Sequence, residues 1–386
     1  MFHRRRPLRF ATICATLSCS IPAAPALADS IGAFTQVSDI GTVSRPTDAK
    51  FDATSGAYVV GASGANMWAE QDAFGFVWKK ARDDLAISAS IRLEGTSAQA
   101  HRKAGLMFRQ SLAADSIYAD VVVHGDGLTS LQFRAIAGGP TREVQCTNTA
   151  PAAVRLDKRG DYVMLSIANV NGAFEASGCS IKIPIRGAFY AGLAVCAHDN
   201  TAFEVAKFRN VRLGPPPLLS AVRTSAIEIV PLASLDRRVI WRSTTHLDAA
   251  SFTAAGDAVC FRNDGQLQRL VLDGKSEPVN VDAANAAECV VASTFGAASV
   301  PMAAGKDGRA WLPKLSPDGQ LIAYLFGRAR GDGGNPLDGD YLLRAIPINT
   351  GEPRDLAQFV GGPGSFGVSP WSPDGARIVF VSREPQ

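Results

Sequence analysis

The chain has 386 residues, enough for two or three domains, and only 19% of them are charged. Residues 1–28 hold four of the 39 basic residues and no acid, so the remainder has 35 basic against 36 acidic residues, a net charge of −1. The near-neutral charge therefore gives no indication of nucleic acid or an anionic membrane as a partner, and we expect no nucleic acid partner. No segment shows a sustained helical spacing of apolar residues, so strands should dominate.

The N-terminus has the pattern of a secretory signal peptide over residues 1–28. Four arginines within residues 4–9 precede the apolar segment 10–21, and Ala26-Leu27-Ala28 forms a cleavage motif. The apolar segment is shorter than the roughly 20 residues that a membrane-spanning helix needs. We expect cleavage after Ala28, a location in the periplasm or outside the cell, and no membrane span.

Five cysteines follow the signal: Cys146, Cys179, Cys196, Cys260 and Cys289. Because the number is odd, at least one lacks an intramolecular partner. No two of them have the C-x-x-C spacing, which argues against a structural zinc site. Either one disulfide forms among the first three, or the cysteines serve as small buried apolar side chains.

Residues 31–213 have the pattern of antiparallel strands joined by tight turns. Asp126-Gly127, Gly138-Gly139 and Asn171-Gly172 are two-residue hairpin signals, because both of their central residues can adopt positive φ. The segments between them have strand length and mixed polarity, as in strands with one wet face. This spacing predicts a β-sandwich or jelly roll.

Several short segments in this region carry a family resemblance. They are Ala104–Arg109, His124–Gly127, Gln132–Arg134, Arg155–Asp161, Phe189–His198 and Phe208–Val211. Together they resemble the concanavalin-A-like jelly-roll domains of the laminin-G-like superfamily, which occur in bacterial secreted and glycan-related proteins. The resemblance covers most of residues 50–213 and implies a jelly roll over 31–213.

A stiff, proline-rich linker is predicted at residues 214–217, and a repeat follows it. A Ser-Pro-Asp-Gly turn precedes an almost wholly apolar strand twice, at 316–325 and at 372–381. The turn residues are Ser316, Pro317, Asp318, Gly319, Ser372, Pro373, Asp374 and Gly375. We expect the two aspartates to hold their own turns. The repeat resembles the TolB-like β-propellers, which implies a partial propeller over 218–386.

The number of blades is low for a closed propeller, which needs roughly four to eight. Residues 218–386 leave room for four at most, and the segment 283–308 shows no repeat. Two strand-like segments, 226–230 and 237–241, are expected to close the propeller against the C-terminus. The predicted fold class is therefore all-β, an N-terminal jelly roll followed by an incomplete propeller.

The candidate ligand-binding residues lie in the jelly roll. His124 and Asp126 flank a hairpin tip, and His198 and Asp199 end another strand. If these strands are neighbours, polar groups around a tryptophan could bind sugar hydroxyls. The full set is Trp68, Trp78, Arg109, His124, Asp126, Arg134, His198 and Asp199. The alternative is that the arginines pair with acids across the sheet and the histidines cap loops.

No catalytic or metal motif is recognised in the sequence. Concanavalin-like glycosidases carry a Glu-x-Asp-x-x-Glu motif, and here Glu70 with Asp72 lacks the second glutamate. In the loop 331–340, Asp332, Asn335 and Asp338, together with Asp340, carry oxygens that suit calcium, but their spacing is not that of an EF-hand. A solvated loop is favoured there, so neither a metal nor a cofactor is expected.

These observations lead to one leading hypothesis and two alternatives. The leading hypothesis is an exported, non-enzymatic binding protein whose jelly roll contacts carbohydrate and whose propeller contacts an envelope protein. The first alternative is a glycan hydrolase or lyase with His124, Asp126 and His198 in acid–base roles. The second is a TolB-like envelope scaffold that binds no small ligand.

Overall fold

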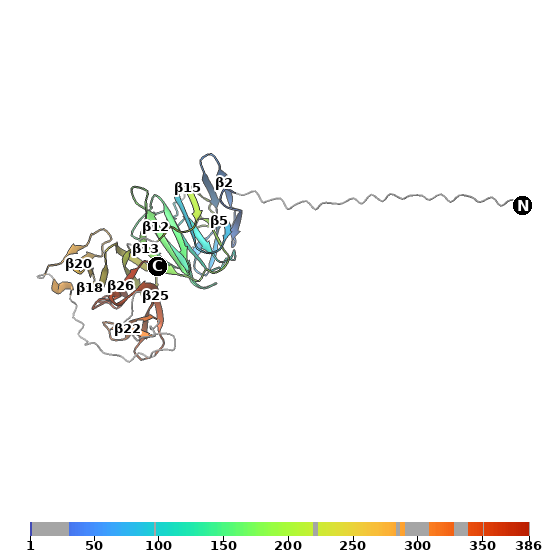
Figure 1. Ribbon diagram of the computed structural model, residues 1–386. Helices are drawn as coiled ribbons and strands as arrows, with labels where there is room; N and C mark the ends of the chain where they lie inside the picture. Colours follow the sequence, from blue (N-terminus) through green and yellow to red (C-terminus); the bar gives the residue numbers. More distant parts are fainter. Residues whose placement is uncertain are drawn as a thin grey trace.

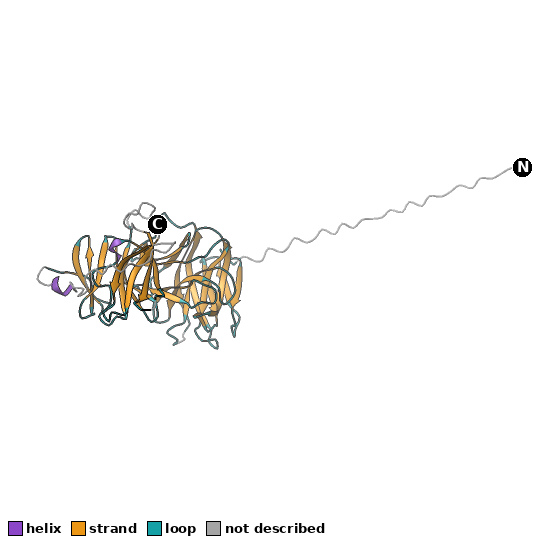
Figure 2. Cartoon of the chain, turned by 90° about the horizontal axis from the view of Figure 1, so that it is seen from below, coloured by secondary structure: helices purple, strands orange, loops and turns teal. Residues whose placement is uncertain are grey.

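The computed structural model describes Met1 and residues 31–95, 98–218, 223–282, 286–289, 309–327, 339–349 and 351–385. The predicted signal peptide, most of the segment 283–308 and the loop residues 331–338 lie outside the described residues. Over the described ranges the fold is all-β, as the sequence predicts, with two short 3-10 segments, η1 (Ala286–Cys289) and η2 (Pro363–Ser365) (Figure 2). No helix in these ranges is long and apolar enough to cross a membrane.

Residues 31–214, here called the sandwich half, form two antiparallel layers of seven strands (Figure 1). The first layer contains, in spatial order, β1 (Gln36–Ile40), β5 (Gln71–Ala81), β14 (Phe189–Cys196), β7 (Lys103–Arg109), β8 (Tyr118–His124), β9 (Thr129–Arg134) and β10 (Arg142–Gln145). The second contains β13 (Phe174–Lys182), β12 (Tyr162–Ala168), β11 (Val154–Arg159), β6 (Leu85–Leu93), β15 (Glu204–Gly214), β3 (Ala57–Ala62) and β2 (Asp48–Asp52).

The main apolar core lies between these two layers. Successive side chains on a strand point to opposite faces. On β7, Leu106 and Phe108 therefore enter the core, whereas Met107 and Arg109 face away from it. We call the face of the first layer that points away from the core its outer face. The same alternation on β8 and β9 puts a row of polar side chains on that outer face.

Residues 223–385, here called the C-terminal half, build propeller-like sheets. Strands β17 (Arg237–Ser243), β16 (Ser225–Pro231), β26 (Arg377–Arg383), β25 (Arg354–Gly361), β24 (Gly339–Pro347), β23 (Leu321–Gly327) and β22 (Arg309–Leu315) continue the first layer beyond β10. A separate four-stranded sheet contains β18 (Leu247–Phe252), β19 (Ala258–Asn263), β20 (Gln266–Val271) and β21 (Val279–Asn280). Both β18–β21 and β22–β25 are four-stranded meanders, as in propeller blades.

The structure also shows how the early and late strands of this half meet. The predicted segments 226–230 and 237–241 fall within β16 and β17. Strand β16 pairs antiparallel with the C-terminal strand β26 along its whole length. The beginning and the end of the C-terminal half are therefore joined in one sheet, as expected from the sequence.

The two Ser-Pro-Asp-Gly segments form hydrogen-bonded turns. In each, the glycine N–H donates to the serine carbonyl, at 2.9 Å for Gly319 and 2.8 Å for Gly375. Both glycines have positive φ, +72° and +69°, which favours glycine. Asp318 and Asp374 each accept a hydrogen bond from the backbone N–H two residues later, at 3.1 and 3.0 Å. Each aspartate thus holds its own turn.

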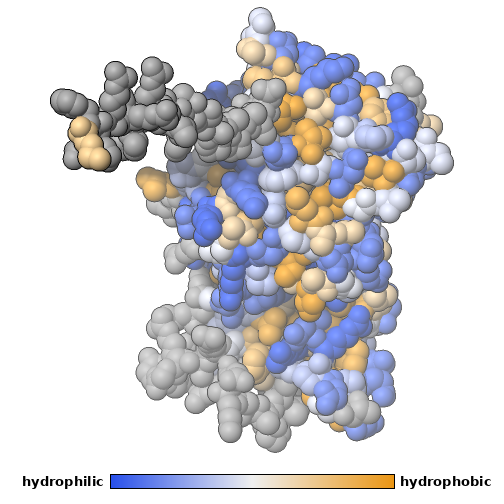
Figure 3. Space-filling view, turned by 90° about the vertical axis from the view of Figure 1, so that its right-hand side faces the viewer, coloured by the Kyte–Doolittle hydropathy of each residue, from blue (hydrophilic) through white to orange (hydrophobic). Residues whose placement is uncertain are grey.

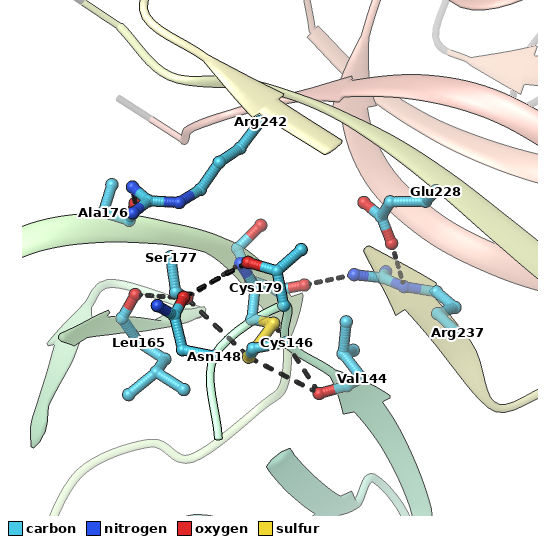
Figure 4. Close-up of a disulfide and its surroundings, with 12 residues drawn as sticks. Val144, Cys146, Asn148, Leu165, Ala176, Ser177, Cys179, Glu228, Arg237 and Arg242 are labelled. Carbon is cyan, nitrogen blue, oxygen red and sulfur yellow. Dashed lines mark hydrogen bonds and ion pairs between the residues drawn. A yellow bond between two sulfur atoms is a disulfide. The ribbon is translucent and has the colours of Figure 1, made fainter. Parts of the chain in front are cut away.

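Two disulfides occur in the described residues, where the sequence left open one or none. Cys146 bonds Cys179 on β13, which ties the end of β10 to the second layer (Figure 4). Cys260 bonds Cys289, which attaches η1 to β19. Cys196 is buried and free.

Removal of the first disulfide should weaken the fold substantially. The bond closes a loop between residues 33 apart in sequence, so the double variant Cys146→Ser/Cys179→Ser should lose about 4 kcal/mol of unfolding free energy. Urea unfolding measures this loss. Cys196→Ala is the control, because it removes a buried thiol without opening a loop. A double-variant loss no larger than that of the control would contradict the prediction.

The two halves are joined by more than the predicted linker. Strand β10 pairs parallel with β17, Val144 opposite Arg237 and Gln145 opposite Arg238. Ala226 and Val239 of the C-terminal half belong to the apolar core of the sandwich half. One sheet and one core therefore cross the predicted boundary at residues 214–217. The predicted domain ranges, 31–213 and 218–386, stay predictions.

Candidate functional site

A hairpin folds across the outer face of the first layer and covers its centre. Strand β4 (Asn66–Trp68) pairs with the start of β5 to form it. The carbonyl of Ala69 accepts hydrogen bonds from the backbone N–H of Thr141 and from Arg134 Nη2, both at 2.9 Å. Tyr118 donates its hydroxyl to Met67 O at 3.3 Å. The hairpin therefore occupies part of the groove that an open sheet face would offer to a ligand.

A buried ion cluster anchors this hairpin. Asp72 Oδ2 lies 2.7 Å from Arg109 Nη1, and Asp72 Oδ1 lies 2.8 Å from Arg134 Nη2. All three side chains are 0% exposed. The structure therefore agrees with the alternative interpretation of the sequence, in which the two arginines pair with an acid across the sheet. Neither guanidinium reaches the surface, and Asp72 is fully engaged as their counter-ion.

Trp78 is also held in place by contacts within the protein. It is 9% exposed, and its ring packs edge-on against Tyr190 with 4.8 Å between the ring centroids. Its Nε1 donates to Ser38 Oγ at 3.0 Å. Burial and a satisfied N–H leave little of this ring for stacking against a sugar.

Three of the predicted residues meet near one end of the outer face. Lys103 pairs in register with His124, and its Nζ lies 5.8 Å from the centre of the Trp68 ring. The ring of His101 lies 5.8 Å from that of His124 and 5.4 Å from that of His198. We call the set of Trp68, His101, Lys103, His124 and His198 the histidine cluster.

Polar side chains extend this cluster under the hairpin. Gln132 Oε1 lies 3.4 Å from Lys103 Nζ, and Gln132 Nε2 lies 3.4 Å from His124 Nε2. Asn66 Nδ2 lies 3.2 Å from His198 Nε2. Beside them, both carboxylate oxygens of Asp120 and Nδ1 of His124 are buried and have no hydrogen-bond partner among the described residues. Such groups normally bind water or a ligand atom.

The electrostatics of the cluster favour the neutral form of two of its histidines. Burial, followed by the positive charge of Lys103, lowers the pKa of His124 to about 3. The same two causes lower the pKa of His198. Burial also lowers the pKa of Lys103 and raises that of Asp120 well above its usual value. At neutral pH the imidazoles of His124 and His198 can therefore both donate and accept a hydrogen bond.

Part of the cluster is open to solvent. His101 is exposed, Trp68 and His198 are half-buried, and His124 and Lys103 lie beneath them. The arrangement leaves the rings of Trp68, His101 and His198 partly exposed above the buried Lys103 and His124. These side chains can form hydrogen bonds with hydroxyl groups.

The two predicted aspartates hold turns beside the cluster. Asp126 Oδ1 accepts the N–H of Leu128 at 3.0 Å at the tip of the β8–β9 hairpin. Asp199 Oδ1 accepts from the hydroxyl and the N–H of Thr201, at 2.7 and 2.8 Å, and these bonds lower the pKa of Asp199. His198, between Cys196 and this turn, has a φ of +58°.

The sequence alone did not single out His101, Lys103, Gln132 and Asn66. Lys103 carries a detectable signal, because it stands at even spacing from Arg109 on the same predicted strand and so on the same face. His101 precedes the strand, and its position depends on the path of the loop before it. No signal in the sequence places it beside His198, which follows 97 residues later.

Within the described residues, no group of three or more His, Cys, Asp or Glu side chains is arranged to hold a metal ion. Of the four residues weighed as calcium ligands, Asp332, Asn335 and Asp338 lie outside the described residues. The fourth, Asp340, forms an ion pair with Lys182 at 2.5 Å.

Comparison with known proteins gives distant structural likenesses. No family model matches the chain, and no curated protein matches it. A TolB structure from Agrobacterium tumefaciens is 17% identical and covers 42% of this chain and 99% of its own, with a TM-score of 0.29. Lectin II from Ulex europaeus is 7% identical, with 47% and 98% coverage and a TM-score of 0.30.

A third solved structure is an alginate lyase, A1-II′, of polysaccharide lyase family 7. It is 10% identical and covers 44% of this chain and 84% of its own, with a TM-score of 0.31. With TM-scores below 0.5, these structures assign neither a family nor a ligand to this chain.

Proposed function

We propose that this protein is an exported, non-enzymatic carbohydrate-binding protein, and that its sandwich half contacts the sugar at the histidine cluster. The observation that carries the proposal is that the partly exposed rings of Trp68, His101 and His198 lie around the buried Lys103. A partly exposed aromatic ring can stack on the apolar face of a sugar, while neutral imidazoles and amides bind its hydroxyls.

Buried polar atoms next to the cluster support the same reading. Asp120 is 0% exposed, and neither of its carboxylate oxygens has a side-chain hydrogen-bond partner among the described residues. Asp120 stands opposite Gln132 in register, and Gln132 Nε2 lies 3.4 Å from His124 Nε2. A bound hydroxyl group, directly or through water, would donate a hydrogen bond to these oxygens.

The experiment is a glycan-array screen of the protein, followed by calorimetric titration of the best-bound oligosaccharide. Trp68→Ala and His198→Ala should each weaken binding about tenfold, because each removes a contact worth roughly 1–1.5 kcal/mol. His246→Ala is the matched control, since its half-exposed side chain lies outside the cluster in the C-terminal half. It should bind as the unchanged protein does.

Two outcomes would contradict the proposal. Full binding by both cluster variants would place the sugar elsewhere, and binding to no glycan would remove the carbohydrate ligand. Time-dependent release of shorter saccharides would instead support the alternative of a hydrolase or lyase. The pKa of His124, about 3, lies far below neutral pH and makes this imidazole a weak general base, which counts against that alternative.

The C-terminal half is proposed to contact an envelope protein. Strand β22 ends the order of the long sheet in the described residues, and a strand at a sheet edge can pair with a strand of another chain. On the face shown in Figure 3, apolar residues form small groups between polar ones. Affinity capture from envelope extracts tests the proposal: a stoichiometric partner lost on introducing a proline at Ala310 would support it.

A further inference from the structure

A cleft of about 1070 Å³ lies where the two halves meet. Its volume is slightly above the range of small-molecule sites, roughly 300–1000 Å³. Strands β10 and β17 lie side by side at its centre, because they are parallel neighbours in one sheet. The end of the sandwich half lines one side, and the segment 270–277 around the β20–β21 hairpin lines another.

The floor of the cleft continues the outer face into the C-terminal half. Glu143 and Gln145 share a face of β10, because they stand two residues apart. Gln145 is opposite Arg238 in register, so this arginine follows them on β17. Arg238 is exposed and reaches toward the other wall, since a Cβ built on Gly274 would lie 3.2 Å from its Nη2.

The charges in the cleft divide into engaged and available groups. Glu175 pairs with Arg242 at 3.6 Å, and Glu143 accepts a hydrogen bond from Gln145 Nε2 at 2.6 Å. Asp236 accepts from the backbone N–H of Glu143 at 3.2 Å. These three carboxylates are therefore held by neighbours.

The available cations are Arg238 and Lys275, which are both exposed and have no ion-pair partner among the described residues. Glu277, also exposed, is the remaining acid of the lining, and Arg377 lies over the Phe252 ring at 5.2 Å. Two exposed cations without an ion-pair partner in the described ranges, Arg238, which reaches Gly274, and Lys275, which follows Gly274 in sequence, therefore lie in the lining with one exposed carboxylate, Glu277. The arrangement favours an anionic ligand.

An aromatic side chain completes the site. Trp241 on β17 lines the cleft and is half-buried, and its buried Nε1 has no hydrogen-bond partner among the described residues. Hydroxyl-bearing side chains also line the cleft, among them Thr147, Thr149, Ser243 and Ser276. Hydroxyls, a tryptophan and guanidinium or ammonium groups suit a ligand that carries both hydroxyls and carboxylates.

We propose that the cleft between the two halves binds an acidic oligosaccharide, with Arg238 and Lys275 contacting its carboxylates and Trp241 stacking on a sugar ring. The site is separate from the histidine cluster and does not rest on it. It is preformed, because the shared sheet and the shared core fix the two halves relative to each other.

The test titrates the purified protein with tetragalacturonic acid and follows heat and tryptophan fluorescence. Cellotetraose, a neutral chain of equal length, is the comparison ligand. The double variant Arg238→Glu/Lys275→Glu should bind tetragalacturonic acid at least about tenfold more weakly, because two attractions become repulsions. The control Arg262→Glu/Arg354→Glu makes the same change in net charge at two exposed arginines outside the cleft lining, and should bind normally.

Other outcomes would overturn the proposal. Equal affinity for cellotetraose would show that the carboxylates are not recognised, and equal displacement by oligoglutamate would show that the sugar is not. Normal binding by the Arg238/Lys275 variant would move the site elsewhere. If that variant fails to fold, Trp241→Phe provides a second test, because it should reduce the fluorescence change and weaken binding. Loss of binding on Trp68→Ala, with Trp241→Phe unaffected, would support the histidine cluster alone.

Discussion

Replacing Asp72 by alanine is expected to lower the free energy of unfolding by about 3–5 kcal/mol. The change would leave Arg109 and Arg134 as two buried charges without a counter-ion, and both side chains are 0% exposed. The β4–β5 hairpin should loosen as well, because Asp72 is its link to both arginines. Urea unfolding measures the loss, and faster proteolysis near residue 70 would report the loosened hairpin.

Two further variants serve as comparisons for Asp72→Ala. Asp72→Asn keeps the size of the side chain and two polar groups that can form hydrogen bonds, but it removes the negative charge. Its loss of unfolding free energy should therefore be smaller than that of Asp72→Ala. Asp126→Ala removes an exposed aspartate that holds one turn, and should cost less than about 1 kcal/mol. A loss for Asp72→Ala no greater than that of Asp126→Ala would mean that the ion cluster does not stabilise the fold.

Replacing Arg237 by alanine should cost a similar amount, about 3–5 kcal/mol, and should uncouple the two halves. Arg237 Nε lies 2.9 Å from Glu228 Oε2, and the two side chains are 5% and 0% exposed (Figure 4). Its guanidinium also donates to Ser180 O at 2.5 Å and to Gln358 O at 2.8 Å. One side chain therefore connects β16, β13 and β25.

The measurement is urea unfolding followed by two probes, tryptophan fluorescence and far-ultraviolet circular dichroism. The unchanged protein should give coincident transitions, and Arg237→Ala should separate them, because the halves lose one of their buried connections. The neighbouring Arg238→Ala is the matched control, since Arg238 is exposed and its loss should stay within about 0.5 kcal/mol. Coincident transitions at unchanged stability in Arg237→Ala would contradict the prediction.

Much of the fold is determined by short segments of the sequence. The Asp126-Gly127 and Asn171-Gly172 signals lie between β8 and β9 and between β12 and β13, close to where the sequence places the turns. The two Ser-Pro-Asp-Gly segments form hydrogen-bonded turns before β23 and β26. These features depend on the φ and ψ preferences and side-chain hydrogen bonds of residues only two to five apart. Local interactions decide them, so a single sequence suffices.

Only part of the candidate site could be predicted from the sequence. Residues at even spacing on a predicted strand share a face, which groups Lys103 with Arg109, or Gln132 with Arg134. The sequence could not tell which of these side chains reach solvent. The hairpin over the outer face decided that: it brought Asp72 to Arg109 and Arg134, 37 and 62 residues away, and left Trp68 half-buried.

By itself the sequence determined the all-β class, the main turns and the polar character of one sheet face. Only the tertiary structure decided that His101 and His198 touch, that Cys146 bonds Cys179, and that β10 pairs parallel with β17. Those contacts join residues that are distant along the chain. Their formation depends on strand register, on loop paths and on which apolar faces are buried together, and none of these is encoded in a short segment.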